Sequence, residues 1–159
     1  MNQGTSEKVR KIAEEFFGTQ NDPNQIPINQ DSTDKLHLIH KDTIIFKFNE
    51  KGDPIAWIVV VPTSVDTMNK FLKKEITEKE LLNIATEEKK FESLYLCAVF
   101  VLPEYRQRGY AKGLIKEAFE KIPNAKNASL YAWIYSKEGE NLIKSMQNET
   151  GRKILFIKD

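Results

Sequence analysis

Residues 100–113 of this chain read FVLPEYRQRGYAKG and join an apolar run to a helical pattern. The apolar run, Leu94 to Val101, predicts a buried strand, and Pro103 ends it because proline has no N–H for strand pairing. A helix from Gly109 to Ile122 should follow, because apolar residues recur at helical spacing at Leu114, Ile115, Ala118, Phe119 and Ile122. The N-terminus of this helix is therefore expected close to the end of the strand.

The predicted helix start has the features of a phosphate site. First-turn N–H groups of a helix have no intrahelical partner and concentrate partial positive charge. Gly109 and Ala111 keep side-chain bulk away from a ligand there, and cations follow at four-residue intervals: Arg108, Lys112 and Lys116. A solvated helix face shows the same charge spacing, so the cations alone leave both interpretations open. The patterns G-x-G-x-x-G and Gly-Lys-Ser/Thr are absent, which argues against a dinucleotide site and a nucleotide P-loop.

The part of the chain before this strand predicts helices at two places and strands between them. Helical spacing predicts a helix from Thr5 to Gly18, and the polar segment Asn21 to Asp34 predicts a loop. Short β-prone runs predict an antiparallel meander of three strands: Leu36 to His40, Thr43 to Phe48 and Ile55 to Val61. The third run is apolar throughout, so both of its faces should be covered. Between Pro62 and Lys90 two short helices are expected, the second opening with a capping box from Thr77 to Glu80.

The part of the chain after residue 122 alternates between strand and helix patterns. It predicts a strand from Ser129 to Tyr135, a helix from Lys137 to Gln147 and a strand from Ile154 to Ile157. We find no internal repeat and no long linker, so residues 1–159 are expected to form a single domain of mixed α/β type.

The composition excludes several classes of partner. Apolar residues make up 40% and charged residues 30%, and no apolar run reaches the ~20 residues of a membrane-spanning helix, so no membrane partner is expected. The first ten residues lack the apolar core of a secretory signal, which favours a cytoplasmic protein. Lys and Arg total 24 against 23 Asp and Glu, so no nucleic-acid partner is expected. One cysteine and two histidines predict no metal site.

The motif Arg106-Gln107-Arg108-Gly109-Tyr110-Ala111 resembles the Q/R-x-x-G-x-G/A acetyl-CoA signature of the GNAT (N-acetyltransferase) superfamily. The preceding residues, Val101 to Tyr105, also look like that family's approach to the motif. The resemblance is specific from Leu94 to Ile122, and the order of the later elements extends it through Ile157. It implies an α/β (α+β) GNAT-like fold whose central mixed, mostly antiparallel sheet is flanked by helices.

The resemblance also implies a cofactor, acetyl-CoA, which serves as co-substrate. Backbone N–H groups from Gln107 to Lys112 would hold its pyrophosphate, with Arg106 beginning the motif. The pantetheine arm would add to the preceding strand and bond the backbone of Val99, Phe100 and Val101. This requires a free strand edge that is splayed from the strand Ser129 to Tyr135.

In the family that the motif resembles, an amine attacks the acyl thioester directly, so a base must first remove a proton from the ammonium form. Such proteins often use a carboxylate near the central strands as base and a tyrosine on the helix after the second core strand as acid. The matching helix here, Lys137 to Gln147, contains no tyrosine. Glu92 is the candidate base, although a glutamate at the start of a strand is more often a surface residue. Tyr135 is the candidate acid, although an aromatic residue at the end of a strand more often serves in packing. Cys97 is a better candidate for a small buried hydrophobe than for an acyl carrier.

Three interpretations follow for the whole chain. The first is an N-acetyltransferase that acts on an amine of a small molecule or a protein, and the second is a non-catalytic acyl-CoA-binding or scaffolding domain. The third, a purely structural domain, agrees least with the motif. The predicted helical insertion between Pro62 and Lys90 makes the acceptor site either atypical or completed by a second subunit, which leaves a homodimer open.

Overall fold

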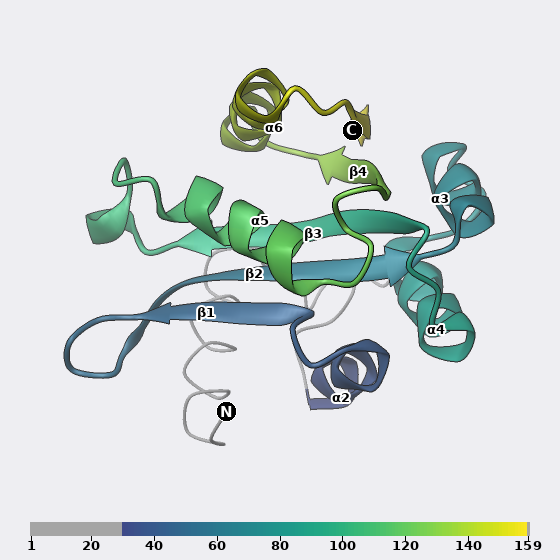
Figure 1. The fold of residues 1–159 in the computed structure, drawn as a ribbon, viewed down its shortest axis with the longest axis horizontal. Coiled ribbons are helices and arrows are strands. Elements are labelled where there is room, and N and C mark those ends of the chain that lie inside the picture. The colour runs from purple at the N-terminus through teal and green to yellow at the C-terminus, as the bar shows by residue number, and fades with distance from the viewer. Residues whose placement is uncertain (1–29, 159) are drawn as a thin grey trace.

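The computed structural model describes residues 30–158, and these form one five-stranded sheet with helices on both faces (Figure 1). The strand order follows the chain: β1 (Ile44–Phe48), β2 (Pro54–Thr63), β3 (Ser93–Val101), β4 (Ser129–Ile134) and β5 (Ile154–Lys158). β1, β2 and β3 pair antiparallel, whereas β3, β4 and β5 pair parallel. The mixed sheet with flanking helices is therefore confirmed, and the predicted helix Thr5 to Gly18 lies outside the described residues.

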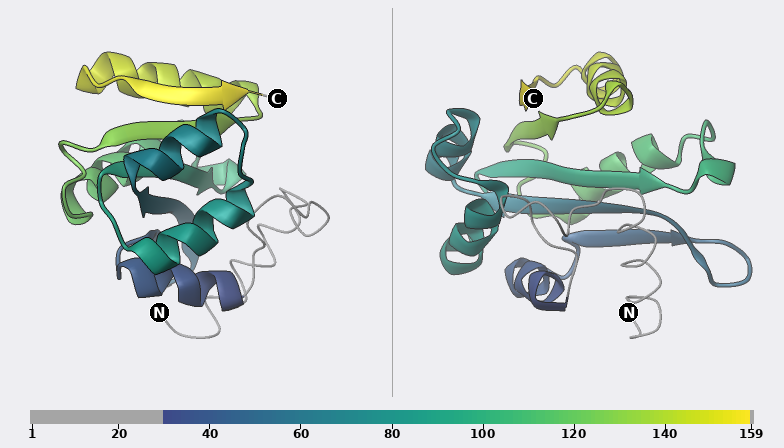
Figure 2. Two further views of the ribbon diagram at one scale, coloured as in Figure 1. Left: turned by 90° about the vertical axis from the view of Figure 1, so that its right-hand side faces the viewer. Right: turned by 180° about the vertical axis from the view of Figure 1, so that it is seen from behind.

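Two groups of helices cover the two faces of the sheet. On one face lie α5 (Tyr110–Lys121) and α6 (Lys137–Thr150), and on the other lie α2 (Gln30–Ile39), α3 (Val65–Leu72) and α4 (Glu78–Glu88). Figure 2 (left) looks at the end of the sheet where β3 begins, which α3 and α4 cover. β2 is buried along almost its whole length, as its apolar run predicts.

The helical insertion between β2 and β3 forms as its caps predict. The side chain of Ser64 caps α3 by accepting a hydrogen bond from the Thr67 N–H. Thr77 and Glu80 form the predicted capping box at the start of α4, each side chain accepting from the other's backbone N–H. The last predicted elements also form, since α6 and β5 follow β4 in the expected order.

The predicted strand from Leu36 to His40 is wrong, because this segment lies mostly within α2. The helix begins inside the segment that we expected to be a loop, where Lys35 pairs with Asp31 one turn earlier at 3.1 Å. Leu36 and Ile39, three residues apart, are both buried against α4 and β2. This five-residue segment has three apolar residues, Leu36, Leu38 and Ile39, which fit either period, and burial of Leu36 and Ile39 on a helix face decided between them.

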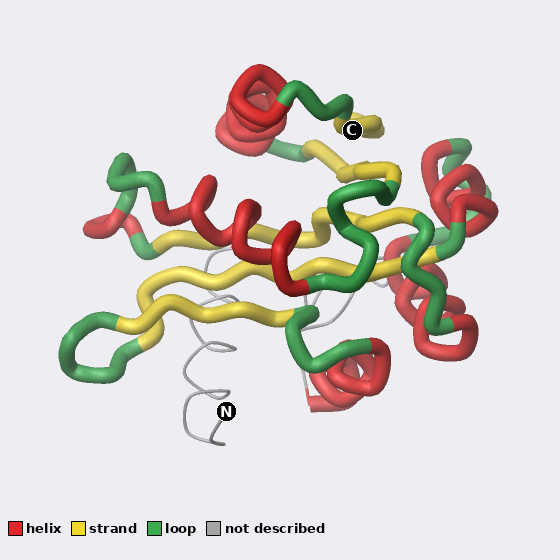
Figure 3. Tube along the Cα trace, viewed as in Figure 1, coloured by secondary structure: helices red, strands yellow, loops and turns green. Residues whose placement is uncertain are grey.

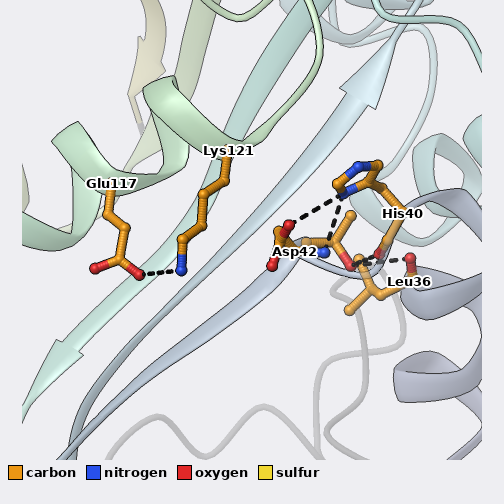
Figure 4. A network of polar contacts seen from close by, with 6 residues as sticks. Leu36, His40, Asp42, Glu117 and Lys121 are labelled. Atoms are coloured by element: carbon orange, nitrogen blue, oxygen red, sulfur yellow. Dashed lines mark hydrogen bonds and ion pairs between the residues drawn. The ribbon is translucent and has the colours of Figure 1, made fainter.

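The turn after α2 is held by polar contacts (Figure 4). His40 Nδ1 accepts a hydrogen bond from the Asp42 N–H at 3.0 Å, and the His40 ring lies edge-on to Phe91. Lys121 approaches from α5, where it pairs with Glu117 at 2.8 Å. The contacts that the structure gives His40 are those of a turn and its packing.

Candidate functional site

β3 and β4 are paired at one end and separate at the other (Figure 3). Pairing runs from Ser93 opposite Ser129 to Leu96 opposite Ala132, although β3 continues to Val101. β4 meanwhile stays paired with β5 to its own end. We call residues 93–96 the closed half of β3, residues 97–101 its open half, and the point between them the fork.

Burial changes at the fork in the same way as pairing. All four residues of the closed half are buried, whereas Cys97, Ala98 and Val99 are half-buried. The register with β2 shifts there too, from Val60 opposite Leu96 to Val59 opposite Ala98, so Cys97 is an extra residue in β3. Such a bulge bends a strand and increases its local twist. Among residues 30–158, no strand pairs with β3 on its β4 side beyond the fork.

The predicted phosphate loop leads from this open half to the start of α5. A short 3₁₀ turn, η2 (Pro103–Tyr105), follows the strand, and the Arg106 Nε donates a hydrogen bond back to the Val101 carbonyl at 3.0 Å. Gln107 and Gly109 then adopt left-handed backbone angles, with φ of 64° and 82°. We call residues 102–109 the motif loop.

The start of α5 is open to a ligand. Gly109 is its N-cap residue and has no side chain to cap the first-turn N–H groups. A Cβ atom placed on Gly109 would meet nothing within 4 Å, so the space beside the loop is unfilled by protein. The residues predicted to hold a pyrophosphate, Gln107 to Lys112, thus surround an uncapped helix start.

The three predicted cations do not form one free stripe. The Arg108 guanidinium lies over the Tyr105 ring at 5.3 Å from its centroid. Lys112 and Lys116 both face Glu149 on α6, at 3.9 Å and 2.7 Å. The hydrogen bond from Lys116 lowers the pKa of the Glu149 carboxyl below its usual range. Two of the three cations therefore share an acidic partner in this structure.

Glu92, the candidate base, lies at the wrong end of β3 to meet the motif loop. Its carboxylate accepts a hydrogen bond from the Val65 N–H, at the start of α3, at 3.1 Å. Phe100 is eight residues further along, which corresponds to roughly 26 Å at the rise of a strand. The structure does not bring Glu92 together with the other candidates.

Tyr135, the candidate acid, directly follows β4 at the end where β3 and β4 separate. It is 46% exposed, and its ring meets Trp133 edge-on at 5.6 Å. Burial of its hydroxyl group, followed by the charges of Cys97 and Glu78, raises the pKa of Tyr135. Tyr135 is therefore protonated at neutral pH, so its phenol can donate a proton.

Glu78, the first residue of α4, was not among the predicted site residues, and it is buried with 6% exposure. Its carboxylate accepts a hydrogen bond of 2.5 Å from the hydroxyl of Tyr95. Burial, then the charge and hydrogen bonding of Glu78, raise the pKa of Cys97. One signal was available: the first turn of α4 carries a second acid, Glu78, besides the Glu80 of the capping box.

Two general properties concern the described part of the chain as a whole. Among residues 30–158, no three His, Cys, Asp or Glu side chains come together in a way that could hold a metal ion. Within the same residues, no helix is both long enough and apolar enough to cross a membrane.

Comparison with known proteins agrees with this arrangement. The model of the acetyltransferase (GNAT) family matches residues 7–143. A structure of Naa20 from Chaetomium thermophilum, solved with a bisubstrate analogue, is similar with a TM-score of 0.56 and 16% identity. The match covers 89% of this chain and 66% of that one.

A second similar structure is that of a histone acetyltransferase HPA2 and related acetyltransferase from Corynebacterium glutamicum. Its TM-score is 0.50 at 18% identity, over 92% of this chain and 80% of the other. No curated protein sequence matches the chain significantly. At these identities the two structures establish the fold.

Proposed function

Because the chain belongs to the GNAT acetyltransferase family, we propose that it is an N-acetyltransferase that moves an acetyl group from acetyl-CoA to an amine. The observation that carries this proposal is the unpaired edge of β3, which leads through the motif loop to the uncapped start of α5. An extended arm and a pyrophosphate need these two features side by side. The similar Naa20 structure holds a bisubstrate analogue, which supports a fold that binds donor and acceptor together.

In this proposal, acetyl-CoA binds along the open half of β3 and the motif loop. Its pantetheine arm adds to the strand edge at Val99, Phe100 and Val101, whose backbone groups bond the amides of the arm. The left-handed residues Gln107 and Gly109 turn the backbone so that successive N–H groups converge on the pyrophosphate. Tyr110, Ala111 and Lys112 supply the first-turn N–H groups of α5, while Arg106 and Arg108 contribute charge.

For the chemical step, Tyr135 is our proposed proton donor to the leaving thiolate. It lies at the open end of β4, and its phenol is protonated at neutral pH. Glu92 stays a prediction, and its contact with Val65 gives it a structural role at the start of α3.

A second candidate function is a non-catalytic domain that binds acyl-CoA or acts as a scaffold. One observation favours it: the stretch Lys137 to Gln147, which supplies most of α6, contains no tyrosine in the place where such enzymes often carry their acid. The enzyme and the non-catalytic domain would bind acyl-CoA at the same site.

Calorimetry with acetyl-CoA tests the site that both functions share. The Ala111→Glu variant places a carboxylate against the proposed phosphates, and we expect its affinity to fall on the order of 100-fold or more. Asn127→Glu adds the same charge at an exposed position beyond the end of α5 and should leave the affinity unchanged. Equal affinities for the two variants would show that the loop assignment is wrong.

Thiol release from acetyl-CoA separates the enzyme from the scaffold. The wild-type chain is offered a panel of 2-phenylethylamine, spermidine and a tetrapeptide with a free N-terminus. Release that depends on the amine supports the transferase. Tight binding of acetyl-CoA with no release for any amine supports the scaffold.

A further inference from the structure

A buried carboxylate lies at the fork between β3 and β4. The Glu78 carboxylate accepts a hydrogen bond from the hydroxyl of Tyr95. Its charge and hydrogen bonding also add to the effect of burial in raising the pKa of the Cys97 thiol. Tyr95 and Cys97 stand on either side of Leu96, the last residue of β3 that pairs with β4. Glu78 therefore lies beside the point where the open half of β3 begins.

Three of the titratable groups around Glu78 belong to the strands of the fork or directly follow one of them. Tyr95 and Cys97 belong to β3, and Tyr135 follows β4. Burial is the largest cause of a raised pKa in all three, and the charge of Glu78 adds to it in each case. The two phenols and the thiol are therefore neutral at neutral pH. The Glu78 carboxylate accepts a hydrogen bond from Tyr95, forms a hydrogen bond with the thiol of Cys97, and acts on Tyr135 through its charge.

The location of Glu78 in its helix favours the ionised form. It is the first residue of α4, where the unpaired N–H groups and the helix dipole stabilise negative charge. The hydrogen bond from Tyr95 stabilises the same form. Burying a carboxylate is costly, and the capping box of α4 is already complete with Glu80.

We propose that Glu78 is the base that takes a proton from the attacking ammonium group, and that Tyr95 positions it. The assignment rests on the proposed function, in which the pantetheine arm follows the open half of β3 and brings the thioester toward the fork. The carboxylate reaches that place from the helical insertion between β2 and β3. The acceptor amine then enters on the face of the sheet that α3 and α4 cover.

The proton balance of this step is complete. The ammonium gives one proton to Glu78, and the free nitrogen pair attacks the acyl carbon, so that a C–N bond forms. The C–S bond breaks with its electron pair on sulfur, and the thiolate takes a proton from Tyr135. The nitrogen loses its second proton, which restores Tyr135 through solvent, and Glu78 releases its own proton to solvent. The net products are the amide, the thiol and one proton.

The test compares two carboxylates on α4. Glu78→Gln removes the proposed base, whereas Glu88→Gln removes a carboxylate that accepts from the hydroxyl of Thr67 at 2.8 Å, close to the start of α3. Thiol release is measured with the member of the amine panel that the wild type acetylates fastest. It is measured again with hydroxylamine, which is mostly unprotonated at neutral pH. Acetyl-CoA affinity and thermal unfolding are followed for each variant.

We expect Glu78→Gln to lower kcat/KM for the alkylamine by about 10²–10⁴ and to remove the acidic limb of its pH profile. The loss with hydroxylamine should stay below about tenfold, because that nucleophile needs no base to reach its free form. Acetyl-CoA affinity should be unchanged, and Glu88→Gln should react at the wild-type rate. Tyr95→Phe should move the acidic limb to higher pH, since the carboxylate loses a hydrogen bond that favours its charged form.

Three results would overturn the assignment. In the first, Glu78→Gln keeps the rate and pH profile of Glu88→Gln. In the second, Glu78→Gln loses the same share of its activity with both nucleophiles and also loses acetyl-CoA binding, which identifies a structural role. In the third, the wild type binds acetyl-CoA but acetylates no amine, and then the proposed enzyme function fails together with its base. Only the third result touches the proposed function, so the two failures are distinguishable.

Discussion

The closed half of β3 is paired on both sides, whereas the open half is paired with β2 alone. The closed half is buried throughout, and the open half is mostly half-buried. Both belong to one continuous strand of nine residues. The difference teaches that a single bulge, at Cys97, allows one strand to contribute to the core at one end and to offer backbone groups to a ligand at the other.

The closed half also contains a buried cluster of hydroxyl groups. Thr63 Oγ1 lies 2.6 Å from Ser93 Oγ and 2.7 Å from the hydroxyl of Tyr131. The Ser93 hydroxyl also lies within hydrogen-bond distance of two backbone carbonyls, those of Thr63, the last residue of β2, and of Ser64 after it. These contacts join β2, β3 and β4, and they satisfy polar groups that would be costly to bury alone.

The largest expected effect comes from truncating an apolar side chain in the closed half. Leu94→Ala should lower the free energy of unfolding by about 2–5 kcal/mol, because Leu94 is 1% exposed and lies in the main core. Val99→Ala, in the half-buried open half, should cost clearly less. Denaturant unfolding measures both, and equal losses would contradict the distinction between the halves.

High pH should act strongly on the closed half. Burial raises the pKa of Tyr95 in the closed half and that of Tyr131, which pairs with it from β4. Above about pH 10 an unfolded tyrosine loses its proton while the folded one keeps it, so the stability that is present below pH 10 falls as pH rises. Each such group contributes about 1.4 kcal/mol per pH unit. Unfolding titrations from pH 9 to 11 measure this slope. Tyr131→Phe should reduce it by the contribution of one tyrosine, about 1.4 kcal/mol per pH unit.

Two tyrosines on β4 and just after it should differ at neutral pH. Tyr131→Phe should cost about 1–2 kcal/mol, because it removes a buried hydrogen bond to Thr63. Tyr135→Phe should change the free energy of unfolding by less than about 0.5 kcal/mol, since its ring is half exposed at the open end. The same variant should lower the rate of thiol release, and an unchanged rate would remove Tyr135 from the reaction.

Gly109→Ala tests the backbone of the motif loop. Its φ of 82° is unfavourable for alanine, so we expect a loss of about 1 kcal/mol in stability together with weaker acetyl-CoA binding. Gly52→Ala, with φ of 83° in the turn between β1 and β2, should cost similar stability and leave binding unchanged. Calorimetry and denaturant unfolding of the pair separate backbone strain from a ligand contact.

The smallest expected effect is that of Glu149→Gln. It releases Lys112 and Lys116, and an exposed pair of this kind contributes about 0–1 kcal/mol to stability. If these cations meet the phosphates of acetyl-CoA, affinity should rise a few-fold at low salt. Asp66→Asn, which breaks the surface pair with Lys70, serves as the control and should not change affinity. A Glu149→Gln affinity equal to that of the control would exclude the two lysines from the phosphate site.

Local patterns in the sequence were sufficient for most of the elements. The apolar run of β3, the proline after it and the helical spacing of α5 each depend on residues close in the chain. The capping box at Thr77 and Glu80 is likewise local, so it was accessible without coordinates. The segment from Leu36 was predicted wrongly because Leu36 and Leu38 fit the period of a strand, Leu36 and Ile39 fit that of a helix, and the burial that decides between them depends on distant elements.

By itself, then, the sequence determined the order of the elements from β1 to β5, the family resemblance and the motif loop, because backbone preferences and hydrophobic period act over a few residues. Tertiary structure alone decided where β3 and β4 separate, since strand register is set by packing across the sheet. It also decided that Glu78 meets Tyr95, 17 residues away, at the fork. A contact of that kind depends on how an inserted helix packs on the sheet, and no spacing in the chain specifies it.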